Sequence, residues 1–245
     1  MALERERAAS NEAKAATLAR ERFIAVLAHE LRNPLQALVG WAGLMGRQST
    51  EQPASAVSER IMTNARLMTR LLDDVTDVAR IDAGKIELNP VPVELVALLS
   101  DEVASFAPRA AEKNVMVTID SQGPALVLAD PHRVRQMLAN LLSNALRFTP
   151  AGTSISVRIG VLNDVVTVTV EDEGPGFSVE PAKLFEPFWQ GEGRTDGLGI
   201  GLALVSQLAQ LHGGSVRATA NSTRRGASIA FSLPSVKSTL SARRA

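Results

Sequence analysis

The sequence contains no cysteine and only three histidines, His29, His132 and His212. The absence of cysteine excludes disulfide bonds, thiolate nucleophiles and cysteine-ligated zinc. Three histidines so far apart in the sequence do not indicate a histidine-rich metal site. The chain is therefore compatible with a reducing compartment.

The chain also lacks net charge and long apolar runs. Its 26 basic side chains balance its 26 acidic ones, which argues against nucleic-acid binding and against electrostatic attraction to a membrane surface. No run of roughly 18 apolar residues occurs, so we expect no membrane-spanning helix. The charged, alanine-rich start has no apolar signal core. We expect a cytoplasmic chain, with any sensor module or membrane anchor lying upstream of this sequence.

The first 84 residues have a helical pattern. Residues 2–22 are rich in strong helix formers, and two apolar stripes follow, over 24–45 and 57–78, with steps of four and three. This spacing predicts two amphipathic helices that form a hairpin, and Gly84 is a natural helix end. Two such hairpins bury their stripes in a four-helix bundle, which predicts a homodimer. Asn64 lies on the second stripe, either as a buried register-fixing amide or as a partly solvated position.

From residue 86 the pattern changes to short alternating strands with helices between them. The combination predicts an α+β sandwich in which helices cover one face of a mixed sheet. Residues 162–164 are typical of a hairpin turn, and 85–92, with two prolines, is the expected hinge. The predicted strands are 115–119, 154–159, 165–170 and 228–233, and the predicted helices are 94–112, 131–148 and 200–212.

His29 lies in the string FIAVLAHELRNPLQAL, one step off the apolar stripe. A neutral imidazole is a competent nucleophile toward phosphorus near pH 7. Asn33 follows one turn later on the same face, and Pro34 releases the carbonyl of Glu30 and so favours a kink. The alternative is an ordinary surface histidine on a coiled coil.

The segment DPHRVRQMLANLLSNALRFTP begins at a helix cap, Asp130. Asn140 and Asn144 lie four residues apart on one face, and amide oxygens suit a hard cation such as Mg²⁺. Arg147 could hold a phosphate and Phe148 could pack on a base or sugar. Such paired asparagines can also be simply solvated.

Two glycine-rich segments follow. In VVTVTVEDEGPGFS a strand leads to Asp172, an acceptor suited to an exocyclic amine, beside Gly174 and Gly176, which permit close approach of a ligand. An ordinary charged turn is the alternative. In GRTDGLGIGLALVSQ, a loop runs into a helix whose free N–H groups at Gly199 and Gly201 would bind an anion. The loop matches neither a P-loop nor a dinucleotide-binding fingerprint.

The string His-Glu-Leu-Arg-Asn-Pro-Leu closely resembles the H-box of sensor histidine kinases. The resemblance implies that His29 accepts phosphate, that Glu30 helps to activate it as a base, and that Asn33 assists dephosphorylation of a partner regulator. The dimerisation domain of that family is a four-helix bundle.

The three later segments, in their order, resemble the N-box, G1-box and G2-box of the ATP-binding fold that histidine kinases share with gyrase-type topoisomerases. LFEPFWQ resembles the F-box of the kinases. The resemblance implies ATP as substrate, Asn144 as the Mg²⁺ ligand, Asn140 as a phosphate contact and Asp172 as the adenine anchor. The implied lid residues are Gly174, Gly176, Gly197, Gly199 and Gly201, with Arg194 placed to meet the γ-phosphate. Arg147 stands where the family often has lysine, and the stretch from Phe188 to Gly197 is short for a lid.

The sequence therefore predicts a signalling helix at 1–22, a dimerisation and phosphoacceptor domain at 23–84, and a hinge at 85–92. A catalytic ATP-binding domain at 93–234 and a disordered tail at 235–245 complete the chain. The predicted function is ATP-dependent autophosphorylation of His29 and transfer to an aspartate of a response regulator, with regulator dephosphorylation as a further activity. The alternatives are a nucleotide-binding scaffold with little kinase activity, which the short lid favours, and an ATPase of the same fold, which the H-box disfavours.

Overall fold

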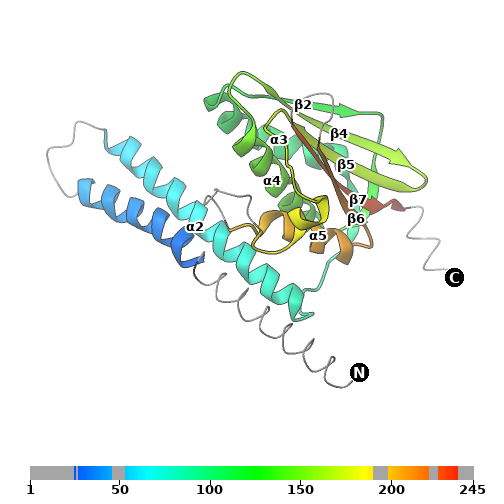
Figure 1. The fold of residues 1–245 in the computed structure, drawn as a ribbon, viewed down its shortest axis with the longest axis horizontal. Coiled ribbons are helices and arrows are strands. Elements are labelled where there is room, and N and C mark those ends of the chain that lie inside the picture. Colours follow the sequence, from blue (N-terminus) through cyan, green and yellow to red (C-terminus); the bar gives the residue numbers. More distant parts are fainter. Residues whose placement is uncertain (1–24, 26, 46–52, 190–197, 221–225, 237–245) are drawn as a thin grey trace. The chain divides into compact units, whose positions relative to one another are not determined.

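The computed structural model describes residues 25, 27–45, 53–189, 198–220 and 226–236 (Figure 1). It divides into two compact units, and the described part of the first consists of helical residues up to 79 together with residues 198–200. The expected signalling helix at 1–22 and most of the expected tail lie outside the described residues. No helix in the described ranges is long and apolar enough to cross a membrane.

The helical unit contains both predicted helices. Residues 27–45 are helical through Pro34, and α2 spans Ala54–Asp82. Arg60 stacks over the Trp41 ring, 4.9 Å from its centroid, and joins the two helices. Asn64 is half-buried and its side-chain amide donates to the Arg60 carbonyl of its own helix at 2.8 Å.

Gly84 ends α2 as its sequence position predicted. It has φ +64°, its N–H donates to the Ile81 carbonyl, and Lys85 N–H donates to the Arg80 carbonyl, both at 2.8 Å. Glycine adopts this left-handed conformation readily because it has no Cβ, and the two bonds satisfy carbonyls that the helix end would leave unpaired.

The second unit is a five-stranded sheet with the order β2-β4-β5-β7-β6, and a separate two-stranded sheet of β1 and β3. The β2 and β4 strands are parallel, and the other neighbours are antiparallel. The strands are β1 (Val91–Glu94), β2 (Met116–Ser121), β3 (Leu126–Ala129), β4 (Ser154–Leu162), β5 (Val165–Asp172), β6 (Ser215–Ala220) and β7 (Ala227–Pro234). This confirms the predicted mixed sheet.

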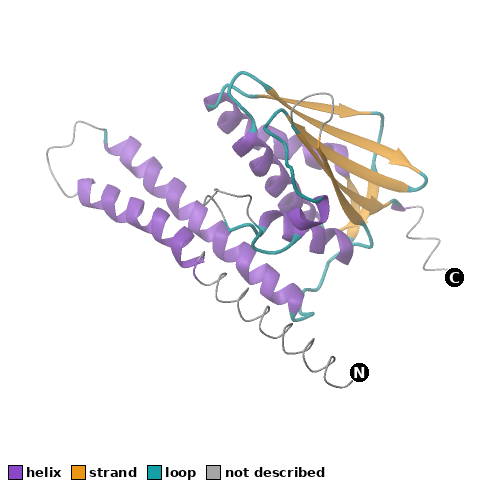
Figure 2. Cartoon of the chain, in the orientation of Figure 1, coloured by secondary structure: helices purple, strands orange, loops and turns teal. Residues whose placement is uncertain are grey.

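Helices cover one face of this sheet (Figure 2). They are α3 (Leu95–Glu112), α4 (Pro131–Phe148) and α5 (Gly201–Leu211), close to the predicted ranges, and a 3₁₀ helix, η1, spans Pro181–Phe185. Alternate side chains of β4, β5 and β7 point toward the helices and are buried, which forms the core with the apolar faces of α4 and α5. The prediction from two-residue alternation is confirmed, because within the described residues helices cover one face of the sheet and the side chains of that face are buried.

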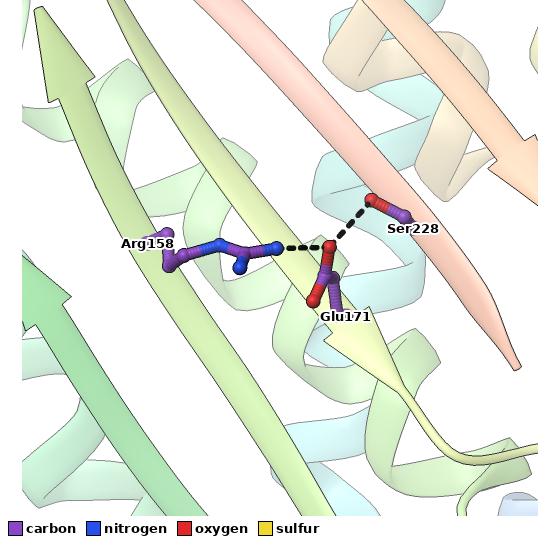
Figure 3. Close-up of polar contacts among 3 residues, drawn as sticks. All are labelled: Arg158, Glu171 and Ser228. Atoms are coloured by element: carbon purple, nitrogen blue, oxygen red, sulfur yellow. Dashed lines mark hydrogen bonds and ion pairs between the residues drawn. The ribbon is translucent and has the colours of Figure 1, made fainter. Parts of the chain in front are cut away.

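The opposite face of the sheet is polar. Arg158 of β4 pairs with Glu171 of β5, and the Ser228 hydroxyl of β7 donates to the same carboxylate at 3.4 Å (Figure 3). These cross-strand contacts link three neighbouring strands in the register that also buries the alternating apolar side chains.

The structure corrects two predicted boundaries, those of the hinge and of the tail, and confirms the predicted hairpin turn. The predicted hinge at 85–92 is too long, because Val91 and Pro92 already belong to β1. The predicted tail begins too early, because Ser235 is buried and its N–H donates to the Asp164 carbonyl at 2.8 Å. The predicted hairpin turn is confirmed: Asn163 and Asp164 have φ of +49° and +60°, as a two-residue type I′ turn requires.

Candidate functional site

The predicted phosphoacceptor histidine is exposed on the first helix. The His29 side chain is 57% exposed, and its Nδ1 lies 3.4 Å from Oε1 of Glu30, whose side chain is 13% exposed. With Nδ1 turned toward the carboxylate, Nε2 is the ring nitrogen left to act as a nucleophile. Asn33 is exposed one helical turn further on.

Helix α4 is fixed at its start by Asp130, as predicted. The Asp130 carboxylate accepts from the N–H groups of His132 at 2.9 Å and Arg133 at 3.3 Å, and from Asn89 N–H at 3.1 Å. Burial acts to raise the pKa of Asp130, but the three N–H bonds and the nearby Arg133 charge hold that pKa below its ordinary value. The cap is therefore a stable anion at the positive end of the helix.

The far end of α5 is bonded to the same cap. His212 Nε2 accepts from the Asp130 N–H at 3.1 Å, and its Nδ1 lies 2.7 Å from the Leu208 carbonyl. These bonds require the neutral tautomer with the proton on Nδ1. The two helices that line the candidate site are thus connected where α4 begins and α5 ends.

Asn140 and Asn144 lie one turn apart on α4, and both are half-buried. The Nδ2 atom of Asn140 is buried and has no hydrogen-bond partner among the described residues. A Cβ added at Gly201, the first residue of α5, would come within 3.6 Å of Asn140 Cγ. An unpaired buried donor beside the N–H groups of a helix start fits an anionic group such as a phosphate.

Asp172 ends β5 and is 7% exposed. Its Oδ1 accepts from the N–H groups of Gly174 at 2.8 Å and Ala227 at 3.3 Å. Burial raises the pKa of Asp172, and the two backbone bonds only partly oppose the rise. A buried carboxylate with few partners fits a ligand that donates a hydrogen bond to it.

The glycines after Asp172 are required by close contacts. A Cβ at Gly174 would lie 2.7 Å from Asp172 Oδ1 and 2.9 Å from the Phe148 carbonyl oxygen. Gly176 has φ +71°, a conformation that favours glycine. The G1-box segment therefore packs directly on the carboxyl end of α4.

The remaining predicted residues are only partly brought together. The Arg147 guanidinium stacks over the Phe148 ring at 4.4 Å, at the end of α4. Gly199 has φ +66°. Arg194 and Gly197 lie outside the described residues.

A divalent cation at this site would be coordinated jointly by protein oxygens and by a bound phosphate. The described residues contain no group of three or more carboxylate, histidine or cysteine side chains that could hold a metal. The amide oxygens of α4 and the oxygens of a bound phosphate are the donors that Mg²⁺ prefers, with water completing its shell.

Gly226, which precedes β7, and Ala227, its first residue, contact Asp172 and are not among the site residues predicted from the sequence. The signal was a glycine two residues before the predicted strand 228–233. A glycine in that position has many possible reasons, and its partner is far away in the sequence, so only the sheet pairing reveals its role.

The comparison with protein families matches both halves of the chain. Residues 19–84 match the His Kinase A (phospho-acceptor) domain, and residues 129–237 match the family of histidine kinase-, DNA gyrase B- and HSP90-like ATPases. The chain belongs to the sensor histidine kinases, as its phosphoacceptor and ATP-binding domains show.

Individual proteins agree with this assignment. The non-motile and phage-resistance protein of Caulobacter vibrioides is 33% identical over 236 residues, which cover 91% of this chain and 28% of that protein. The sensor protein TorS of Escherichia coli is 34% identical over 220 residues, 87% of this chain and 24% of that protein. Full-length ShkA in complex with AMPPNP is 34% identical, with a TM-score of 0.65 over 87% of this chain and 45% of that one. The chain thus spans about a quarter of the length of these two curated relatives.

Proposed function

We propose that this chain is the autophosphorylating core of a two-component sensor kinase, in which His29 attacks the γ-phosphorus of ATP. The single observation that carries the proposal is that one chain holds an exposed histidine beside a carboxylate and a separate nucleotide-type site. The new bond joins a His29 ring nitrogen to phosphorus, the bond to the β-phosphate oxygen breaks, and ADP leaves. Such transfer depends on positioning and on charge neutralisation.

The His29–Glu30 pair supports the first step. A carboxylate at Nδ1 stabilises the positive charge that forms on the ring as the other nitrogen attacks. The exposure of His29 supports access by a second domain. The chain's Asn33 would then act on a water in the dephosphorylation of the partner regulator.

The unpaired Asn140 amide and the start of α5 support the binding of phosphate groups. In this proposal Asn144 contributes an oxygen to Mg²⁺, which supplies charge neutralisation on the triphosphate, and Asp172 accepts from the adenine amine. Arg147, Phe148, Gly199 and the residues outside the described ranges, Arg194 and Gly197, complete the proposed nucleotide contacts. AMPPNP in the 34% identical ShkA is in keeping with ATP as the substrate.

The proposal includes two protein partners. Both helices of the first unit expose large apolar side chains, which supports a homodimer; they are Leu35, Val39, Met45, Met62, Leu67 and Leu72. The phosphoryl group would pass from His29 to an aspartate of a response-regulator receiver domain, as the family assignment suggests. A sensor module outside this sequence would control the reaction.

The test is incubation with Mg²⁺ and γ-labelled ATP, followed by acid and alkali treatment of the labelled protein. We expect a label that survives alkali, is lost in acid and is absent from His29→Ala. The matched control is His132→Ala, because His132 is exposed on α4 and should keep the label. Label retained in His29→Ala, or no label while ATP binds, would contradict the proposal and favour a nucleotide-binding scaffold.

A further inference from the structure

The Asp172 carboxylate is held at one oxygen by two segments of the chain. The Gly174 N–H, two residues on, and the Ala227 N–H, at the start of β7, both donate to Oδ1. Among the residues that the structure describes, none donates a hydrogen bond to Oδ2. The side chain is therefore fixed at one oxygen and available at the other.

Gly226 brings β7 against the backbone of Asp172. It has φ +155°, and a Cβ at this position would lie 1.9 Å from the Asp172 carbonyl oxygen and 3.0 Å from its carbonyl carbon. Both atoms belong to the backbone and cannot rotate away, so any side chain at 226 must displace Asp172 or β7. This close approach sets the distance between the Ala227 N–H and Oδ1.

The contact continues on the other side of Gly226. A Cβ at Gly176, in the G1-box turn, would lie 2.8 Å from the Gly226 carbonyl oxygen. The backbone of residue 226 is thus packed between the residue that ends β5 and the turn that follows it. A side chain at Gly176 or at Gly226 would collide with backbone atoms of this contact.

We propose that Gly226 and the Ala227 N–H form a positioning element for Asp172, which aims Oδ2 at the exocyclic amine of the base and so determines nucleobase selectivity. This inference rests on the proposed ATP function of the site. Hydrogen bonds lose strength steeply with distance and angle, so a displaced Asp172 would bind the exocyclic amine more weakly. Gly226 is then a specificity determinant that does not touch the nucleotide.

The experiment compares ADP with purine riboside diphosphate, which lacks the amine, by calorimetric titration of the whole chain in Mg²⁺. We expect the wild type to prefer ADP by about 10-fold or more, as one hydrogen bond to a charged group implies. In Gly226→Ala the affinity for ADP should fall by about 10-fold while that for the analogue stays within about 2-fold. The preference should therefore be nearly abolished.

Gly160→Ala is the matched control. Gly160 lies in β4 of the same sheet, and an added Cβ would meet no atom within 4 Å. This variant should keep both affinities. If Gly226 has a purely structural role, Gly226→Ala should lower the affinity for both nucleotides equally and leave the preference unchanged. That result would overturn the inference.

Asp172→Asn separates this inference from the proposed function. Replacing the carboxylate by an amide should abolish the preference in the presence of an intact Gly226. If Asp172→Asn loses the preference and Gly226→Ala keeps it, the positioning role of Gly226 is contradicted, whereas the proposed binding of adenine by Asp172 is supported. If the wild type has no preference for ADP, the assigned role of Asp172 is wrong and the inference fails with it.

A measurement on the wild type removes any dependence on the folding of Gly226→Ala. The Ala227 amide resonance should shift as the Asp172 carboxyl is titrated, and this titration should be absent in Asp172→Asn. An Ala227 amide that does not respond would show that its bond to Oδ1 does not form, and would overturn the inference.

Discussion

Two carboxylates of the sheet-containing unit, Asp172 and Glu94, have pKa values that folding shifts in opposite directions. Burial is the first influence on both and raises each pKa. Glu94 accepts three backbone N–H bonds, from Ala125, Ala97 and Val96, and these outweigh the burial and lower its pKa. Asp172 accepts only two and keeps a raised pKa. The residue proposed to bind the base is therefore the one whose charge the folded protein satisfies less well.

The raised pKa of Asp172 predicts that Asp172→Asn stabilises the nucleotide-free protein at neutral pH. Folding makes this carboxyl bind its proton more tightly, so the stabilisation from protonation is present below the ordinary aspartate range. It is lost as the pH rises through the raised pKa. The neutral amide avoids that loss, and we expect a melting temperature higher by on the order of 2 °C at pH 7.

Thermal unfolding at pH 7 and near pH 3 checks this prediction. The difference between the variant and the wild type should disappear in acid, where the wild-type carboxyl is protonated. A variant that melts lower at pH 7 would show that Asp172 stabilises the fold through its charge.

At the scale of elements, Glu94 joins two structures. It ends β1, caps the start of α3 through Val96 and Ala97, and accepts from Ala125, which immediately precedes β3. The Glu94 side chain therefore fixes the start of α3 and also links it to the segment that leads into β3.

We predict that Glu94→Gln destabilises the fold by about 1–2 kcal/mol at pH 7, because one charge-assisted acceptor of three N–H groups is weakened. The lowered pKa means that this stabilisation is present above the ordinary glutamate range and is lost as the pH falls through the lowered value. Denaturant unfolding at pH 7 and in acid measures both. Glu180→Gln is the control, since Glu180 is exposed and makes no side-chain cap bond; an equal effect at both positions would contradict the capping role.

The sequence predicted the strands with long alternation and missed β1, β3 and the edge strand β6. The long alternations of β4, β5 and β7 and the capped start of α4 at Asp130 were found from local patterns. The β1 strand carries Pro92, and β3 has only four residues, so neither has the alternation that identifies a strand. Their pairing follows from contacts distant in sequence.

The candidate site divides in the same way. Asp172, Asn140 and the glycines of the turns stood out because residue type and spacing are local properties of the sequence. The second donor to Asp172 comes from Ala227, whose own side chain carries no chemistry. A backbone N–H has no signature in a sequence, and only the pairing of β5 with β7 brings it to the carboxylate.

At the scale of the whole molecule, the chain combines a helical unit that exposes apolar side chains with an α+β unit that has a polar open sheet face. Leu35 and Leu72, on different helices of the first unit, are each 49% exposed. Apolar side chains that recur along both helices of a hairpin are typical of an incomplete bundle.

We predict that Leu35→Glu weakens dimerisation by at least about 100-fold, since each dimer would bury two new charges. Light scattering after size-exclusion chromatography measures the mass directly. Leu162→Glu, at the 75% exposed hairpin tip of the α+β unit, should leave the dimer intact. A wild-type chain that is monomeric at micromolar concentration would contradict the bundle, and so would a Leu35→Glu variant that stays dimeric.

The hydrogen bond from the Asn89 N–H to the Asp130 carboxylate attaches the connector between the two units to the ATP-binding fold. Gly84 closes α2, so the connector runs only from Gly84 to Asn89 and extends at most about 18 Å. In the proposed reaction, a tether this short would hold the bound nucleotide at a local concentration on the order of millimolar relative to His29. The meeting of His29 with its phosphoryl donor would depend on this confinement, and lengthening the connector would slow autophosphorylation without altering either site.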